Sequence, residues 1–94
     1  MRLSKDEITV LKDTLYALNS DAKIYLFGSR VYDDKKGGDI DLLIVGQNFT
    51  KKLLRKLRVE FFKHFGEQKL DIIVDDGSFS DPFNKIIYQK AIRL

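Results

Sequence analysis

Hydrophobic and polar residues follow a helical period at the start of the chain. Ser4-Lys5-Asp6-Glu7 has the form of a capping box, in which Ser4 and Glu7 satisfy the first free amides of a helix. Apolar residues then recur at helical spacing from Ile8 to Leu18, and the polar run Asn19-Ser20-Asp21 breaks the pattern. We therefore expect a helix with one apolar stripe that faces a core.

Three later segments have the composition of strands instead. Residues 22–27 (AKIYLF), 39–45 (DIDLLIV) and 69–75 (KLDIIVD) are rich in β-branched and aromatic residues. Glycine and polar residues bound them: Gly28-Ser29 ends the first strand, and the polar, glycine-rich segment 33–38 precedes the second. We expect three strands joined by short connections.

Two further helices are predicted between and after these strands. Thr50 is a suitable N-cap for a helix whose apolar residues are spaced by four, and Gly66 stands where a helix C-terminal glycine belongs. Asp81-Pro82 begins the last helix, whose apolar face continues to Leu94. The basic residues from Lys51 to Arg58 are expected to form a solvated helix face, with an acidic partner or RNA as the alternative. The predicted order is α-β-β-α-β-α in a single domain over residues 1–94, of the α/β (α+β) class.

Composition narrows the functional classes. The chain has 94 residues, no cysteine, one histidine and a net charge of +3, with Lys+Arg 17 and Asp+Glu 14. The absence of cysteine excludes disulfides, iron–sulfur clusters and thiol nucleophiles, and a single histidine excludes a His-pair metal site. No apolar run approaches the ~18 residues of a membrane span, and the N-terminus lacks the apolar core of a secretory signal. We expect a cytoplasmic protein that does not depend on a membrane or on direct nucleic-acid binding.

Three aspartates interrupt the apolar strands. Asp39 and Asp41 are two residues apart, so strand alternation places both side chains on one face. Adjacent carboxylates repel each other and favour a divalent cation, and Mg²⁺ typically takes one or two protein carboxylates together with phosphate and water. Asp71 repeats the pattern in the third strand and joins the pair if the two strands are neighbours. The alternatives are a solvated edge face for Asp39 and Asp41, and an edge-strand charge that discourages aggregation for Asp71.

The turn after the first strand is a candidate phosphate site. Gly28 permits close approach of a phosphate, and Ser29 offers a hydroxyl beside free backbone N–H groups. Arg30 can add a bidentate contact to the same anion or pair with a nearby aspartate. Gly38 lets the following loop pass close to a nucleotide. Tyr32, in the same region, is expected to pack against its neighbours, with stacking on a nucleotide as the alternative.

These motifs together resemble the DNA polymerase beta-like nucleotidyltransferase superfamily. The resemblance rests on Leu26-Phe27-Gly28-Ser29-Arg30, a short loop, Gly38-Asp39-Ile40-Asp41 and a later Leu70-Asp71, which occur in the family's order over nearly the whole chain. The family fold is a small mixed β-sheet flanked by helices. The small size is similar to that of the minimal nucleotidyltransferases (MNT), antitoxins that act beside HEPN-domain ribonuclease toxins. Many relatives continue as G-S-R-A-R-G, whereas this chain has Val31, Tyr32 and Asp33 at those positions.

The resemblance implies a metal-dependent transfer of AMP from ATP, with a tyrosine of a HEPN toxin as the acceptor in the antitoxin branch. By position, Gly28 and Ser29 would bind the triphosphate, beside the candidates Arg30 and Gly38 named above. Asp39 and Asp41 would bind two Mg²⁺ ions, for which Mn²⁺ is an alternative, and Asp71 would bind the catalytic ion and activate the acceptor hydroxyl.

Two other functions fit the same residues. One is an antitoxin that neutralises its toxin by binding alone. The other is transfer to an aminoglycoside or another small molecule, for which a homodimer would have to supply the acceptor pocket.

Overall fold

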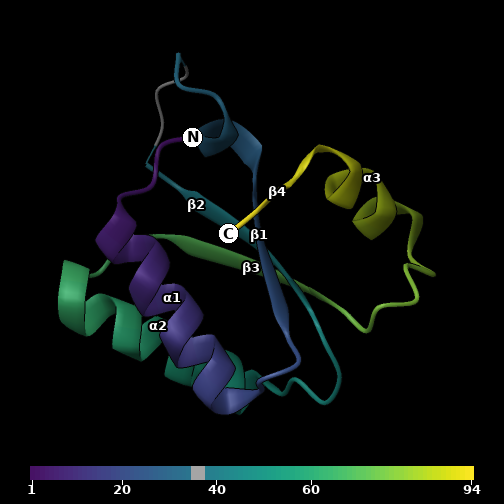
Figure 1. Cartoon of the computed structure of the whole chain (residues 1–94), viewed down its shortest axis with the longest axis horizontal. Coiled ribbons are helices and arrows are strands. Elements are labelled where there is room, and N and C mark those ends of the chain that lie inside the picture. The colour runs from purple at the N-terminus through teal and green to yellow at the C-terminus, as the bar shows by residue number, and fades with distance from the viewer. Residues whose placement is uncertain (35–37) are drawn as a thin grey trace.

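The protein folds as a four-stranded mixed sheet between two helices on one face and one helix on the other (Figure 1). The computed structural model describes residues 1–34 and 38–94. Its elements are α1 (Lys5–Leu18), β1 (Lys23–Phe27), the short 3₁₀ turn η1 (Gly28–Val31), β2 (Ile40–Val45), α2 (Lys51–Phe65), β3 (Leu70–Asp75), α3 (Pro82–Lys90) and β4 (Ile92–Arg93). The helices and the first three strands follow the predicted order α-β-β-α-β-α.

The helix boundaries are set by the residues that the sequence indicates. Ser4 and Glu7 form both hydrogen bonds of the capping box at the start of α1. The side chain of Thr50 accepts from Leu53 N at the start of α2, and Gly66 ends that helix with φ +81°. Asp81 caps α3 ahead of its first residue, Pro82. None of the helices in the described part of the chain is long and apolar enough to cross a membrane.

The strands are ordered β3-β2-β1-β4, so β2 is central. β1 pairs antiparallel with β2, and β2 pairs parallel with β3. A hairpin-like turn and loop can join β1 to β2, whereas the parallel pair requires a crossover, which α2 provides. This topology places Asp41 of β2 directly beside Asp71 of β3 and opposite Phe27 of β1.

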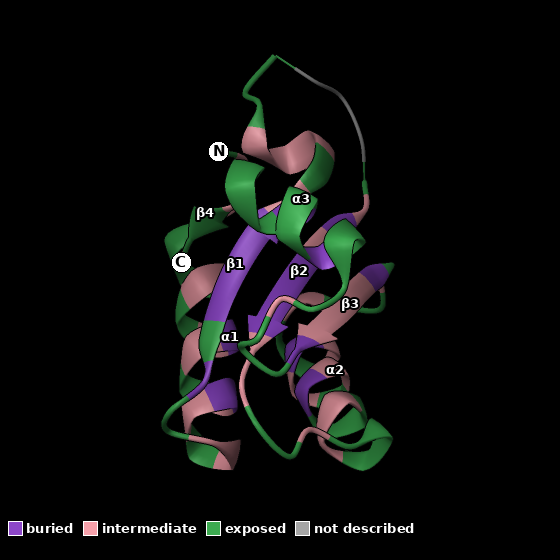
Figure 2. Cartoon of the chain, turned by 90° about the vertical axis from the view of Figure 1, so that its right-hand side faces the viewer, coloured by how far each residue is buried: buried purple, intermediate pink, exposed green. Residues whose placement is uncertain are grey.

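Side-chain alternation divides the buried residues between the two faces of the sheet (Figure 2). Ile40, Leu42 and Ile44 of β2 belong to the main core, which contains the buried apolar residues of α1 and α2. Leu43 belongs to a smaller cluster on the opposite face, together with Ile87 of α3. Asp41 shares the alternation of Leu43, so the carboxylate lies on the α3 face of the sheet.

The basic run of α2 forms the predicted solvated face. Lys51, Lys52, Arg55 and Lys56 are exposed, while Leu57 and Phe61 on the other side of the helix are buried in the core. This distribution is that of an ordinary amphipathic helix.

The C-terminal segment differs from the prediction. The last helix was expected to continue to Leu94, but α3 ends at Lys90, where Ala91 adopts extended angles. Ile92 and Arg93 then pair with Leu26 and Tyr25, adding β4 to the free edge of β1. The apolar spacing of the last residues suits a helix and a strand alike, and tertiary pairing with an exposed edge decides between them.

Asp75 organises the connection from β3 to α3. The carboxylate of Asp75 accepts hydrogen bonds from the backbone N–H groups of Gly77 and Phe79. Asp75 is also buried and accepts from Asn84 Nδ2 at 3.1 Å, a contact between β3 and α3. The buried carboxylate is therefore satisfied, and it fixes α3 against the sheet.

Candidate active site

Two strands, β2 and β3, bring the predicted carboxylates to one end of the sheet. Asp39 immediately precedes β2, Asp41 is its second residue, and Asp71 is the second residue of β3. The parallel register sets Asp41 beside Asp71. β2 is a central strand, which rules out the alternative of a solvated edge face for Asp41. β3 is an edge strand, so the alternative of a charge that discourages aggregation still applies to Asp71.

The electrostatics of Asp41 reflect this crowding. Partial burial is the main cause that raises the pKa of the Asp41 carboxyl above its usual range, and the neighbouring charges of Asp71 and Asp39 raise it further. Lys69 opposes the shift. A cation that enters the cluster therefore stabilises the ionised form of Asp41.

Lys69 is the cation that contacts the cluster here. Its Nζ lies 3.5 Å from Asp39 Oδ2 and 3.8 Å from Asp71 Oδ2, and these two carboxylates raise the pKa of the lysine. The side chain of Lys69 is 66% exposed, so these ion pairs add little to the stability of the fold. Lys69 was not predicted, although it alternates with Asp71 along the predicted third strand and so falls on the same face.

The donor set suits a hard divalent cation. Carboxylate oxygens are the ligands that Mg²⁺ prefers, and an ammonium group already stands between two of them. Within residues 1–34 and 38–94, no three acidic or histidine side chains are arranged to hold a metal ion together. Asp39 and Asp71 instead turn toward Lys69. Metal binding by Asp39, Asp41 and Asp71 thus stays a prediction, and it requires the Lys69 side chain to leave.

Gly28 makes close packing against Asp41 possible. Its φ is +77°, and a Cβ at this position would lie 2.2 Å from Asp41 Oδ2. Any other residue at position 28 would therefore displace the carboxylate and strain the backbone. The structure thus brings Gly28 of the turn and Asp41 of the carboxylate cluster together.

The arginine of the turn, Arg30, donates to two backbone carbonyls, and its contact with a phosphate stays a prediction. Arg30 Nη1 donates to the carbonyl of Arg2 at 2.8 Å, and Arg30 Nη2 donates to the carbonyl of Gly38 at 3.1 Å. Asp33, the alternative partner for Arg30, pairs with the N-terminal ammonium of Met1, and this hydrogen bond lowers the pKa of Asp33. Gly38 takes part through its carbonyl, and a Cβ there would meet nothing within 4 Å among the described residues. Residues 35–37 of the predicted loop lie outside the described residues.

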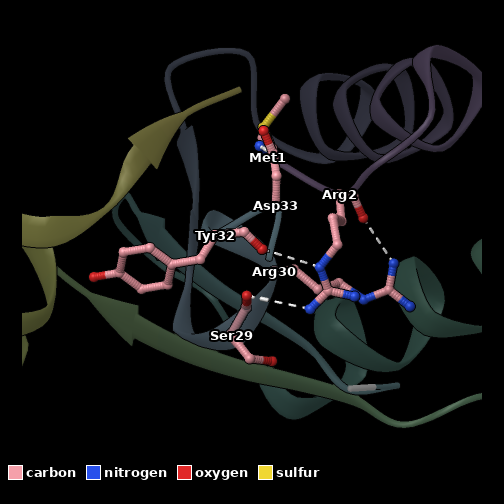
Figure 3. Close-up of polar contacts among 6 residues, drawn as sticks. All are labelled: Met1, Arg2, Ser29, Arg30, Tyr32 and Asp33. Carbon is pink, nitrogen blue, oxygen red and sulfur yellow. Dashed lines mark hydrogen bonds and ion pairs between the residues drawn. The ribbon is translucent and has the colours of Figure 1, made fainter. Parts of the chain in front are cut away.

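Arg2 holds the turn from the other side (Figure 3). Its Nη2 donates to the carbonyl of Ser29 at 3.2 Å and its Nε donates to the carbonyl of Tyr32 at 3.1 Å. The backbone N–H of Arg2 also donates to the carbonyl of Arg30. The hydroxyl of Ser29 and the ring of Tyr32 point away from Arg2 in Figure 3. No pattern in the sequence connects residue 2 with residue 29, so sequence reasoning missed this contact.

Arg2 is therefore expected to position the turn without touching the reacting groups. We expect Arg2→Gln to raise the KM for the nucleotide roughly tenfold, the effect of losing one or two hydrogen bonds from a charged donor, and to change kcat less. Steady-state kinetics measure both constants. Arg55→Gln, an exposed arginine of α2 on the other side of the sheet, is the matched control. Equal effects of the two substitutions would refute the positioning role.

Of two large pockets on the surface, one is lined by predicted site residues and the other is not. A cleft of about 470 Å³ is lined by Gly28, Ser29 and Tyr32 on one side and by α3 on the other. Tyr32 was expected to pack against its neighbours, but its side chain is 51% exposed and lines this cleft. A groove of about 720 Å³ runs between α1 and α2 and contains none of the predicted site residues. The cleft beside Gly28 is the one that can serve the candidate site.

Comparison with known proteins identifies the family. A family model described as a nucleotidyltransferase domain matches residues 8–93. No curated protein matches the sequence. The matched region contains β1, the Gly28-Ser29 turn and all three aspartates of the cluster, and the chain belongs to the nucleotidyltransferase domain family.

Proposed function

We propose that this protein transfers AMP from ATP to a tyrosine hydroxyl of a partner HEPN-domain toxin, and acts as the antitoxin of that pair. Membership of the nucleotidyltransferase family supports the reaction class, because the family generally uses nucleoside triphosphates and divalent metal ions. The observation that carries the proposal is the juxtaposition of Asp41 with Asp71 and Gly28 at one end of the sheet.

The choice of a protein acceptor has a separate basis. The family match occupies residues 8–93, so these 94 residues contain no second domain to bind a small molecule or a nucleic acid. The proposal therefore places the acceptor on another polypeptide. The HEPN toxin and its tyrosine follow from the resemblance to MNT antitoxins.

In this proposal, Asp39 and Asp41 would hold both Mg²⁺ ions, and Asp71 would join them in holding one of the two, the catalytic ion. When bound, the ions supply charge neutralisation of the triphosphate and a lowered pKa for the attacking hydroxyl. Asp71, whose side chain is 46% exposed, is accessible to an incoming hydroxyl and receives its proton. The acceptor oxygen bonds to the α-phosphorus, the bond to the β-phosphate oxygen breaks, and pyrophosphate leaves.

The Gly28-Ser29 turn and the carboxylates have different tasks in this reaction. The turn orients the triphosphate, while the aspartates act at the reacting phosphorus. Lys69 neutralises Asp39 and Asp71 in the absence of a nucleotide and must withdraw when the site is loaded.

The test is an incubation of the purified protein with Mg²⁺ and α-labelled ATP in an extract of its source cells. We expect a labelled protein band that is absent with γ-labelled ATP and absent with the double variant Asp39→Asn/Asp41→Asn. Mass spectrometry of the band should locate AMP on a tyrosine of the partner.

Other results would select the remaining functions. Label in a small molecule would replace the protein acceptor with a small-molecule substrate. Neutralisation of the toxin by the double variant, without any label, would show that binding alone suffices.

A further inference from the structure

The cleft beside the Gly28-Ser29 turn contains a cation that the sequence motifs do not indicate. Its walls are residues 27–29, Val31 and Tyr32 on one side and Ile86, Ile87 and Lys90 of α3 on the other. Lys90 is the one basic residue among the described residues that line the cleft. Arg30 does not line it, because the guanidinium of Arg30 reaches the carbonyls of Arg2 and Gly38 instead.

We propose that Lys90 binds the terminal phosphates of the nucleotide in the cleft between α3 and the Gly28-Ser29 turn. This inference rests on the proposed nucleotidyl transfer and adds to it the cation that recognises the polyphosphate tail. Phosphate groups are bound in proteins mainly by lysine, arginine and backbone N–H groups, and lysine acts there as a point charge.

The fold places Lys90 at the turn by an indirect route. Lys90 is the last residue of α3, and Ile92 and Arg93 pair with Leu26 and Tyr25 of β1. The same strand β1 ends at Phe27 and leads directly into Gly28. Both sides of the cleft are thus attached to β1, although Lys90 follows Gly28 by 62 positions in the sequence.

The surroundings of Lys90 favour binding of an anion. Ile86 and Ile87 give the α3 wall an apolar surface along which the lysine stem can lie while its ammonium group reaches the opening. Lys90 itself is exposed, so a phosphate that enters the cleft can reach its ammonium group.

The cleft also adjoins the carboxylate cluster through Gly28. Gly28 both lines the cleft and packs against Asp41, so a triphosphate can extend from the aspartates into the cleft. The reacting α-phosphate then lies at the carboxylates, and the leaving pyrophosphate lies beside Lys90. In this arrangement α3 provides the positive charge that Arg30 does not.

The test compares Lys90→Gln with Lys85→Gln, which removes an exposed lysine from the same helix outside the cleft. Isothermal titration measures the affinity of each protein for Mg²⁺-ATP, for inorganic tripolyphosphate and for AMP. We expect Lys90→Gln to weaken binding of ATP and of tripolyphosphate about tenfold and to leave AMP binding unchanged. Lys85→Gln should bind all three as the unchanged protein does. Lys90→Met, which keeps the apolar stem, is expected to repeat the loss, and Lys90→Arg to retain most of the affinity.

Two results would overturn the assignment while leaving nucleotidyl transfer intact. One is equal affinity of the Lys90→Gln and Lys85→Gln proteins for ATP. The other is an equal loss for ATP and AMP, which would place Lys90 at the nucleoside or the α-phosphate instead. If the unchanged protein bound neither ATP nor tripolyphosphate, both the inference and the proposed function would fail.

Discussion

Asp41→Asn is expected to abolish nucleotidyl transfer and at the same time to raise the melting temperature of the protein at neutral pH. The carboxylate of Asp41 lies beside Asp71, near Asp39 and against Gly28. An asparagine there cannot supply the negative charge that a divalent ion requires. Losing several kcal/mol of metal-dependent stabilisation of the transition state corresponds to a fall in kcat/KM on the order of 10³-fold or more.

The gain in stability follows from the pKa of the same carboxyl. Burial, then Asp71 and Asp39, raise the pKa of Asp41 in the folded protein above its ordinary value of 3.8. Ionisation of Asp41 therefore destabilises the folded protein. This cost in the free energy of unfolding is fully present at a pH above the raised pKa. The cost decreases as the pH falls through the raised pKa and disappears below 3.8. Asparagine carries no charge at any pH, so the variant avoids the cost.

Thermal unfolding between pH ~4 and ~7.5, followed by circular dichroism without metal, tests this dependence. The melting temperature of Asp41→Asn should exceed that of the unchanged protein most at neutral pH, and the difference should narrow toward the acid end. Asp13→Asn removes an equivalent charge from an exposed position of α1 and should alter neither activity nor the pH profile. A variant that is less stable than the unchanged protein at neutral pH would contradict the electrostatic account.

Gly28→Ala is expected to impair both folding and transfer. The φ of +77° is costly for any residue with a Cβ, and that Cβ would lie 2.2 Å from Asp41 Oδ2 and 3.1 Å from Asp41 Cγ. Relief of this overlap requires the carboxylate or the turn to move. We expect a loss of about 1–3 kcal/mol in the free energy of unfolding and at least a ~10²-fold fall in kcat/KM, because misplacing a reacting group by about 1 Å has an effect of that size.

The variant Gly66→Ala is a control that separates backbone strain from overlap with the Asp41 carboxylate. Gly66 has a similar φ of +81°, and a Cβ there would meet nothing within 4 Å among the described residues. A Cβ at Gly66 therefore adds backbone strain without any contact to the site. Chemical denaturation should show a loss of stability for both variants, whereas transfer should be unaffected by Gly66→Ala. Normal activity of Gly28→Ala would show that the position of Asp41 is not set by the turn.

Sequence-based predictions are correct where the interactions that decide the local structure all lie within one short segment. The capping box at Ser4 and Glu7, the N-caps Thr50 and Asp81, and the terminal glycine Gly66 are each confirmed. They depend on hydrogen bonds and backbone angles within a few residues. The alternation of Asp41 with the apolar residues of β2 also predicted correctly that carboxylate and core lie on opposite faces.

Local signals are ambiguous at the C-terminus. Residues 91–94 fit the helical stripe, and their pairing with β1 depends on an edge that exists only after the sheet has formed. The surroundings of Arg30 and Tyr32 likewise depend on segments that are distant in the sequence. The partner of Arg30 is the carbonyl of Arg2, 28 residues away, and Tyr32 faces a cleft that α3 completes.

The sequence by itself determined the helices, the three main strands and the identity of three aspartates and a glycine-serine turn, because these follow from periodicity and spacing along the chain. The tertiary structure alone decided which groups surround them. The parallel register places Asp71 beside Asp41, Lys69 stands between Asp39 and Asp71, Arg2 fixes the turn, and the β4 pairing brings Lys90 to the cleft. Each of these contacts joins segments that are distant in sequence or depends on strand register, and such contacts are fixed by packing of the whole domain rather than by local preference.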